Sequence, residues 1–358
     1  MSREERTMRA RAATALASAL VLLGSFSTAS PAADNGDNNR KLDTSSGLTP
    51  DMNDPRIAGD PDYGVCRGTD PICYHNWVAN RDNRVLIYSR TAGPRHANIN
   101  PALAAGLNPP LSATQNIAQR AIVQWMAEVG VEVNWTEDVN TLSGQLGPGQ
   151  DNYKAVIFLS PTRDTLWKHG TAISPTSAVN TSTNAHLDAA KTALRQFMRS
   201  GGGFVGIHNA FGTEYNWPYY EGLLGNSNYY NHGANQDGTV KVVAKDPSTA
   251  GLPETWPFRD EWYNLRPFPT KVKFLLTVDA SQLTLSNDHP GHGKFHPVAW
   301  CQYYDGGRVW VTTLGHDGQA FVDGSSFPGQ AQFKKLIVQA ILSAMGNTEF
   351  CTPDHRQR

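Results

Sequence analysis

The sequence has little cysteine, little net charge and no long apolar run. Lys and Arg number 31 against 32 Asp and Glu, a formal net charge of -1, which gives no general attraction to nucleic acid or anionic membrane. We therefore expect neither partner. An apolar run at residues 12–26 is too short to span a bilayer, which needs about 20 residues. No later segment has the pattern of a transmembrane helix.

Residues 1–33 have the features of a secretory signal peptide. A basic start precedes the apolar run, and small residues follow it, with a cleavage site near Ala32 or Ala33. We predict that the protein is secreted, to the periplasm or beyond the cell. About 325 residues then remain, enough for one large domain or two small ones.

Only four cysteines are present, and none forms a CxxC metal or redox pair. An even number in an exported chain indicates two disulfides, for which three pairings exist. We favour Cys66 with Cys73, which closes a small loop, and Cys301 with Cys351, which ties the tail to a late strand. A cysteine nucleophile is correspondingly disfavoured.

The chain divides by composition into four parts. After the signal peptide, residues 34–80 form a polar linker and a disulfide-pinned segment, residues 81–347 form the main domain, and residues 348–358 form a tail. Strands are expected at 84–89, 131–137, 154–160 and 201–207, alternating with helices at 113–129 and 185–199. This alternation predicts an α/β fold with a doubly wound, mainly parallel sheet.

The second half is richer in strand patterns. Strands are expected at 239–244, 271–278, 298–304 and 308–315, before a last helix at 330–345. Asp305, Gly306 and Gly307 separate the last two strands and predict a hairpin.

The stretch GGGFVGIHNAFG, residues 201–212, contains a GxGxxG spelling. Its glycines follow a predicted helix and enter a strand, the reverse of the context that a nucleotide-binding loop requires. We read them as a helix end and the start of a strand.

His208 falls where that strand should end, at the edge of the sheet where open α/β folds bind ligands. A histidine on such an elbow can act as a general acid, a general base or a metal ligand. The alternative is a hydrogen-bonded histidine that only closes a loop.

Several motifs together resemble the ThuA-like, or trehalose-utilisation, family. They are TAGPRHANI after the first strand, GGGFVGIHNA, DEWYNL at 260–265 and HPVAWCQYYDGGRVWVTTLGHDG at 296–318. The resemblance covers about residues 83–346 and implies a flavodoxin-like fold of the class I glutamine amidotransferase type. It also implies a role in the uptake or breakdown of trehalose and related sugars.

The resemblance does not imply amidotransferase activity. That superfamily carries a cysteine at the elbow, whereas this chain has His208. Where the family often has His-Pro, this chain reads Lys245-Asp246-Pro247, so any role of that histidine is lost or moved to Asp246.

Residues in the shared motifs are the predicted site. Asp260 and Glu261 are adjacent, so only one can face the cleft of an extended segment, and we favour Glu261. The predicted catalytic residues are His208, Glu261 and His316, and the predicted substrate-binding residues are Arg95, His96, Asn209, His232 and Trp300.

A divalent metal such as zinc is a candidate cofactor. The candidate ligands are His208, His232, His296 and His316, and Glu261 would complete the ligand set. None of these histidines belongs to a local metal-binding motif. The histidine-rich segment 288–296 is otherwise read as a solvated loop.

Two functions compete at this point. The first is an exported enzyme that acts on a small carbohydrate by histidine and carboxylate acid/base chemistry. The second is a non-catalytic sugar-binding or scaffold module, whose aromatic side chains would stack on sugar rings. The candidate aromatic residues are Trp217, Tyr219, Tyr220, Trp262 and Trp300.

Overall fold

The computed structural model describes residues 64–147, 149–150, 152–166, 189–215, 217–286 and 288–352. The predicted signal peptide lies outside these residues. So do the first part of the 34–80 segment, the start of the helix predicted at 185–199 and the last six residues of the tail.

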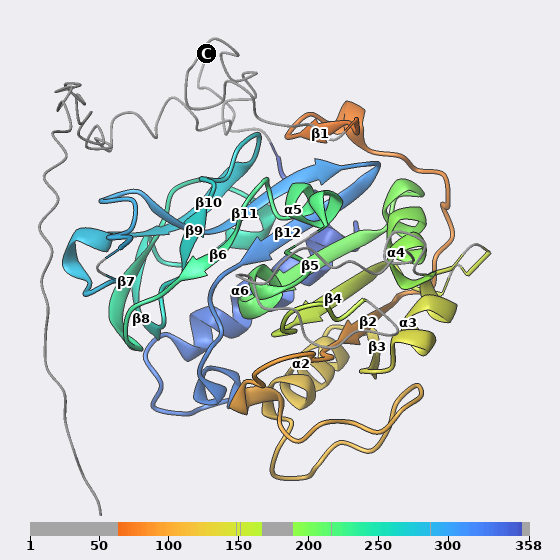
Figure 1. Ribbon diagram of the computed structural model, residues 1–358, viewed down its shortest axis with the longest axis horizontal. Helices are drawn as coiled ribbons and strands as arrows, with labels where there is room; N and C mark the ends of the chain where they lie inside the picture. The colour runs from red at the N-terminus through yellow and green to blue at the C-terminus, as the bar shows by residue number, and fades with distance from the viewer. Residues whose placement is uncertain are drawn as a thin grey trace, which may run out of the picture. The chain divides into compact units, whose positions relative to one another are not determined.

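A ten-stranded sheet organises the domain, and half of it is parallel (Figure 1). The parallel strands lie in the order β3 (Glu132–Thr136), β2 (Arg84–Tyr88), β4 (Ala155–Leu159), β5 (Gly203–Ile207) and β12 (Gly307–Thr312). Counted along the chain, this is the flavodoxin-like order 2-1-3-4-5. The predicted fold class is confirmed.

The β-rich second half extends this sheet with antiparallel strands. From β12 the order continues through β11 (His296–Tyr304), β10 (Lys273–Val278), β7 (Gln236–Val242) and β8 (Thr255–Asp260). Strand β1 (Arg67–Gly68) pairs with β11, while β6 (Asn228–Asn231) and β9 (Asn264–Arg266) form a separate pair. The hairpin predicted between β11 and β12 turns at Asp305 and Gly306, which have φ of 47° and 94°.

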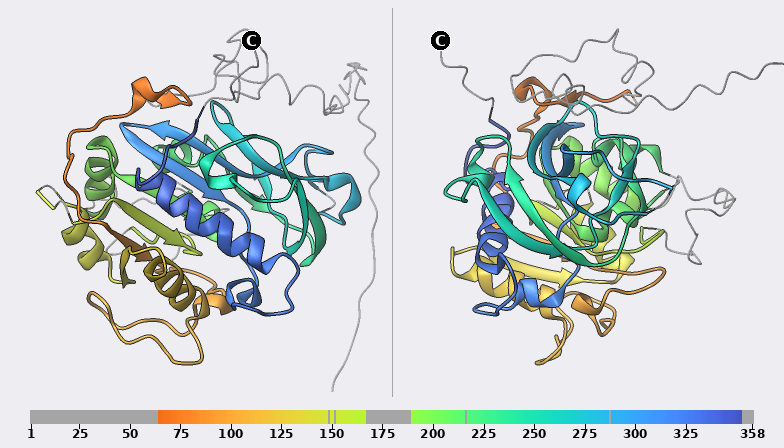
Figure 2. Two further views of the ribbon diagram at one scale, coloured as in Figure 1. Left: turned by 180° about the vertical axis from the view of Figure 1, so that it is seen from behind. Right: turned by 90° about the vertical axis from the view of Figure 1, so that its left-hand side faces the viewer.

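Helices cover both faces of the sheet (Figure 2). Helices α2 (Ile117–Ala127) and α6 (Gln330–Ala344) pack on one face, and α3 (Val139–Leu146), α4 (Ala189–Arg199) and α5 (Pro218–Leu223) belong to the core on the other. Successive side chains of a strand serve the two cores alternately: Ile87 joins the α2 and α6 side, and Tyr88 joins the α3 and α4 side.

The main differences from the sequence predictions concern short elements. The helix predicted at 113–129 begins only at Ile117, because Asn116 before it has a left-handed φ of 50°. Helix α3 and strand β8 were not predicted. Helix α3 has only eight residues, and β8 contains Pro257, which lacks a backbone donor and is tolerated because β8 is an edge strand.

Both favoured disulfides are present. Cys66 is bonded to Cys73 and Cys301 to Cys351, with Cα separations of 5.2 and 5.7 Å. Among the described residues, no helix combines the length and the apolar character that crossing a membrane would require.

Candidate active site

The elbow predicted at the end of β5 has an unusual backbone. His208 starts a short 3-10 helix, η5 (His208–Gly212), with a left-handed φ of 53° that few non-glycine residues adopt. Such strain gathers at functional sites. Before β5, Gly201 has a φ of 97° and the Gly202 N–H donates to the Phe197 carbonyl at 2.9 Å. The triple glycine is therefore a helix end and the start of a strand, as predicted.

The His208 imidazole is fully buried, and both of its nitrogens have partners. Nδ1 lies 2.9 Å from the carbonyl oxygen of Thr313, which can only accept, so Nδ1 carries the proton. Nε2 then accepts from the Tyr263 hydroxyl at 2.9 Å. Burial lowers the pKa of His208 well below its usual range, and the neighbouring His96 and His316 add to this effect. The ring is neutral.

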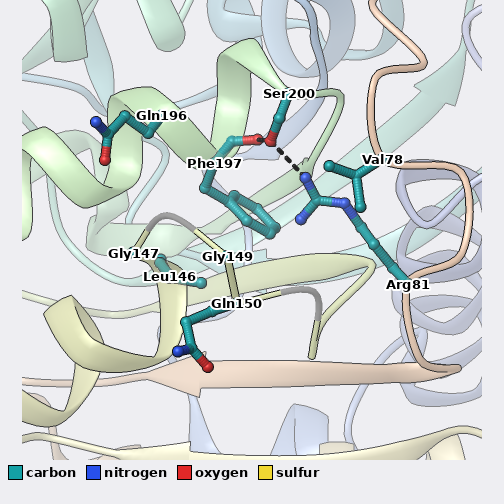
Figure 3. A pocket seen from close by; sticks show the side chains of 9 residues that line it. All are labelled: Val78, Arg81, Leu146, Gly147, Gly149, Gln150, Gln196, Phe197 and Ser200. Carbon is teal, nitrogen blue, oxygen red and sulfur yellow. Dashed lines mark hydrogen bonds between the residues drawn. The ribbon is translucent and has the colours of Figure 1, made fainter.

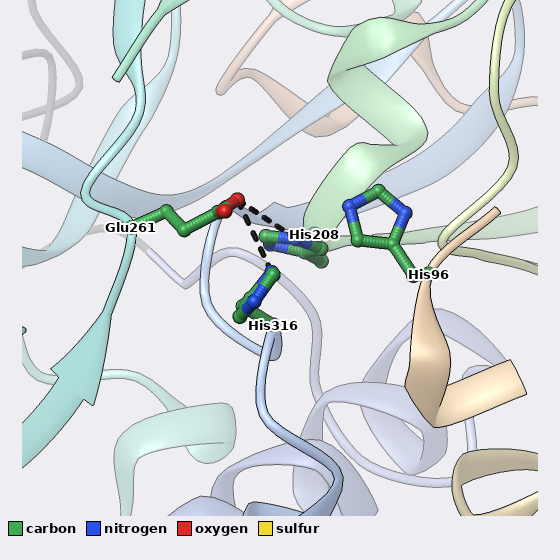
Figure 4. A group of neighbouring side chains, drawn as sticks. All are labelled: His96, His208, Glu261 and His316. Carbon is green, nitrogen blue, oxygen red and sulfur yellow. Dashed lines mark ion pairs between the residues drawn. The ribbon is translucent and has the colours of Figure 1, made fainter. Parts of the chain in front are cut away.

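Three further side chains converge on His208 from separate elements (Figure 4). His96 follows β2, Glu261 follows β8 and His316 follows β12, and donor atoms of all four residues lie within 4.8 Å of one another. Glu261 Oε2 is 3.1 Å from His316 Nδ1 and 3.8 Å from His208 Nε2. We call His96, His208, Glu261 and His316 the edge cluster.

Burial and mutual contact set the charges in the edge cluster. Burial alone would raise the pKa of Glu261, but the contact with His316 and the other imidazoles outweighs it, and the pKa is lowered. Burial opposes protonation of His316 too, yet the Glu261 carboxylate raises its pKa. Burial lowers the pKa of His96 to about 4. The cluster thus combines an anionic carboxylate with imidazoles of differing basicity.

Asp260 lies close to the other nitrogen of His208. Its Oδ1 is 3.9 Å from His208 Nδ1 and accepts the Glu261 N–H at 2.8 Å, while its Oδ2 accepts the Gly315 N–H at 2.7 Å. Burial raises the pKa of Asp260 to about 7. Glu261 faces the cluster, as favoured from the sequence, but Asp260 also contributes, by fixing the segments that carry Glu261 and His316.

The two other proposed metal ligands, His232 and His296, lie in different surroundings. His232 lies at the rim, with its Nε2 3.7 Å from Glu261 Oε1 and its side chain 32% exposed. The prediction for His296 is wrong. Its Nε2 donates to the Tyr263 carbonyl at 3.0 Å and its Nδ1 accepts the His292 N–H at 3.2 Å, so both nitrogens are occupied.

The segment 288–296 is not a simple solvated loop. His289, His292 and His296 pack ring against ring, with centroid separations of 5.1 and 5.5 Å. His296 is fully buried and His289 is 8% exposed. We call these three residues the loop cluster.

Three predicted substrate-binding residues have structural roles. Trp300 is fully buried and donates to the Leu224 carbonyl at 3.1 Å, so its assignment is wrong. The Arg95 guanidinium is committed to Glu137, at 2.6 Å, and to backbone carbonyls near His96. Asn209 donates to the Pro161 carbonyl at 2.8 Å, and its Oδ1 lies 3.2 Å from the Tyr263 hydroxyl. Arg95 and Asn209 therefore position their neighbours.

Sequence reasoning missed the role of Tyr263. Its ring packs on His208 with a centroid separation of 4.6 Å, and its hydroxyl bridges His208 and Asn209. The signal was available in DEWYNL, where Tyr263 follows Glu261 by two residues.

A separate pocket lies at the opposite edge of the sheet (Figure 3). It is lined by the ends of α3 and α4 together with Val78 and Arg81, just before β5 begins. Arg81 donates there to the Ser200 hydroxyl at 2.5 Å and to the Tyr153 carbonyl at 3.1 Å. This pocket contains none of the edge cluster.

The fold and the elbow define the class of protein. This is a flavodoxin-like α/β domain with a histidine at the elbow after β5, while all four cysteines are held in disulfides. Residues 84–342 match the ThuA family, described as trehalose utilisation. The chain belongs to this family.

Comparison with solved structures finds ThuA-like proteins at low identity. One from Bacteroides uniformis is 19% identical, with 75% of this chain and 94% of that chain covered and a TM-score of 0.48. One from Parabacteroides merdae is 15% identical, with coverage of 77% and 92% and the same TM-score of 0.48. A protein described as a GMP synthase component from Thermoplasma acidophilum is 9% identical, with coverage of 74% and 94% and a TM-score of 0.39. The search of curated proteins found no match.

Proposed function

We propose that this protein is an exported enzyme that transforms a small carbohydrate by acid/base chemistry at the edge cluster. The substrate class is a glycoside of the trehalose type or a keto-sugar. Membership of the trehalose-utilisation family supports the substrate class, and the position of the cluster at the carboxyl edge of the parallel strands supports the site.

The contact between Glu261 and His316 carries the proposal. The carboxylate and the imidazole are 3.1 Å apart, and their side chains are 14% and 30% exposed, so a ligand can reach both. A carboxylate paired with an imidazole can accept a proton from one sugar oxygen and donate one to another. His208, being fully buried, orients this pair from below and does not meet bulk solvent.

The rim of the site supplies candidate substrate contacts. His232 follows β6 and lies against Glu261, while Tyr229 of β6 packs edge-on against Tyr263 at a centroid separation of 4.6 Å. Both side chains are partly exposed. A sugar bound over Glu261 would meet this tyrosine and this histidine.

The binding-module alternative has less support, because the aromatic residues on which it depends are buried. Tyr220 and Trp300 are 0% exposed, Trp262 is 1% and Tyr219 is 6% exposed. Trp217 is partly buried, stacked on Tyr219 and covered by the Lys191 ammonium at 5.2 Å. None of the five offers a free ring face of the kind that stacks on sugars.

Export is supported by the two disulfides, because such bonds persist in oxidising compartments. Together with the basic and apolar N-terminal pattern, they favour a mature protein outside the cytoplasm.

The test is product analysis with a panel of trehalose-type glucosides and keto-sugars. We expect turnover of at least one substrate, and a fall in kcat/KM of about 100-fold or more for Glu261→Gln. Glu128→Gln is the matched control, because Glu128 is a surface residue paired with Lys334 on α6. Binding without turnover by the wild-type protein would favour the module, and unchanged turnover in Glu261→Gln would reject the site.

A further inference from the structure

The edge cluster has the composition of a transition-metal site. It presents three imidazole nitrogens and one carboxylate oxygen within 4.8 Å of one another. Imidazole-rich sets suit Zn²⁺ and similar ions, whereas Mg²⁺ and Ca²⁺ prefer oxygen ligands throughout. Soft thiolate ligands are absent, because every cysteine of the chain is disulfide-bonded.

Two imidazoles have nitrogens that hydrogen bonding does not fully satisfy. His316 Nδ1 is buried and, within the part of the chain that the structure describes, makes no hydrogen bond of good geometry, although the Glu261 carboxylate lies beside it. His96 directs one ring nitrogen toward the other three side chains (Figure 4). A buried polar atom without a well-placed partner costs free energy, which coordination of a cation would recover.

The surroundings hold the ligands as a metal site requires. The Thr313 carbonyl fixes the proton of His208 on Nδ1, leaving Nε2 as the ligand nitrogen. Asp260 clamps the backbone at Glu261 and Gly315. The Asn98 side chain donates to the Gly315 carbonyl at 2.8 Å and so joins the His96 segment to the His316 segment.

The spacing is close to that of a bound ion. Four ligands placed tetrahedrally around one ion with bonds of about 2.1 Å are about 3.4 Å apart. The ligand atoms here lie within 4.8 Å of one another, so the widest pair needs to close by at most about 1.4 Å. Rotation of the Glu261 and His316 side chains, both partly exposed, can supply that movement.

Tyr263 is the competitor for the ligand atom of His208. Its hydroxyl donates to Nε2 at 2.9 Å, but Asn209 Oδ1 lies 3.2 Å away as a second acceptor. The hydroxyl can therefore turn to Asn209 and leave Nε2 free without losing a hydrogen bond.

We propose that His96, His208, Glu261 and His316 bind one divalent transition-metal ion, for which Zn²⁺ is the test ion. The ion would polarise a substrate oxygen and so deepen the proposed function, on which this inference rests for the location of the chemistry. Metal binding is measured without any sugar, so either idea can fail alone.

The experiment uses tag-free protein, stripped with a chelator and titrated with ZnCl₂ by calorimetry. We expect one ion per chain, and affinity weakened about 100-fold or more in His96→Ala and in Glu261→Gln. His292→Ala is the matched control, because His292 is a partly buried histidine of the loop cluster, and the variant should bind as wild type. Tyr263→Phe should bind at least as tightly as wild type, because it removes the competing hydroxyl.

Two results would overturn the proposal: wild-type affinity in both His96→Ala and Glu261→Gln, or loss of binding in His292→Ala with the edge cluster intact. Should the ligand variants fail to fold, the wild-type protein decides through Co²⁺. One equivalent should replace the weak absorption of aqueous Co²⁺ by the more intense d–d absorption, at longer wavelength, of four-coordinate cobalt held by nitrogen and oxygen ligands. Absence of that band would also overturn the proposal.

Discussion

The described residues include two groups of three closely packed histidines, the edge cluster and the loop cluster, and the groups differ in whether a carboxylate joins the imidazoles. Ring centroids are 4.7 and 5.3 Å apart between neighbours in the edge cluster, and 5.1 and 5.5 Å apart in the loop cluster. In the loop cluster, both ring nitrogens of His296 hydrogen-bond to backbone groups, and His289 Nδ1 accepts the Gly291 N–H at 3.2 Å.

The edge cluster differs by including a carboxylate. Glu261 contacts His208, His316 and the rim residue His232, each from a different segment of the chain. Convergence of imidazoles is therefore not sufficient for chemistry. The carboxylate distinguishes the edge cluster from the loop cluster.

The largest expected effect follows from removing the central imidazole of the edge cluster. His208→Ala should lower kcat/KM on an established substrate by about 100-fold or more, because it removes the buried ring that orients Glu261 and His316. His292→Ala, the equivalent change in the loop cluster, should leave kcat/KM within about threefold. Circular dichroism would confirm folding, and equal losses in the two variants would remove the distinction between the clusters.

The second effect tests the clamp that only the edge cluster has. Asp260→Asn replaces one carboxylate oxygen by an amide NH₂, so the N–H of Glu261 or Gly315 loses its acceptor. We expect the free energy of unfolding to fall by about 2 kcal/mol, measured by urea denaturation. Asp237→Asn at the surface should cost about 1 kcal/mol or less. Equal losses of unfolding free energy in Asp260→Asn and Asp237→Asn would show that the two hydrogen bonds of Asp260 are not important for stability.

The third effect is the pH dependence of stability that His296 of the loop cluster contributes. Burial lowers the pKa of His296 to about 3, so the unfolded chain takes up this proton near pH 6.5 and the folded chain does not. Its contribution to stability is complete above pH 6.5 and is lost as pH falls toward 3. The loss is about 1.4 kcal/mol per pH unit, or about 2 kcal/mol between pH 6.5 and 5.

His296→Gln provides the comparison for this pH dependence. Glutamine retains one donor and one acceptor but does not titrate, so denaturation curves of the variant should depend less on pH over that range. Parallel curves for the variant and the wild type would contradict a neutral, buried His296.

The smallest effect concerns the rim of the edge cluster. His232→Asn should raise KM about threefold to tenfold and change kcat less, because His232 contacts Glu261 only at 3.7 Å and is partly exposed. Steady-state kinetics on the same substrate measures both values. A large loss of kcat with unchanged KM would move His232 from the rim into the reactive centre.

The fold could be predicted from the sequence where strands are buried on both faces. Strands β2 and β4 are short, nearly continuous apolar runs, and helix α2 between them has a clear apolar face. Helix α3 could not be found in this way, because eight residues carry too little periodicity.

A residue of the candidate site could be predicted only where its position at the end of a strand fixes the direction of its side chain. His208 follows β5 directly, and its place at the edge of the sheet follows from that. His296 also begins a strand, but the β10 and β11 pairing contains register shifts, so counting residues does not give the direction of its side chain. The clamp by Asp260 depends on Gly315, 55 residues away, and no local pattern reveals it.

The two halves of the sheet contribute unequal parts of one centre. The parallel half supplies the three imidazoles, and β8 at the far end of the antiparallel half supplies Glu261. A fragment limited to the flavodoxin-like half would keep the three histidines of the edge cluster and lose Glu261. The antiparallel extension is therefore not a separable module, because a chain without it would lack the Glu261 carboxylate.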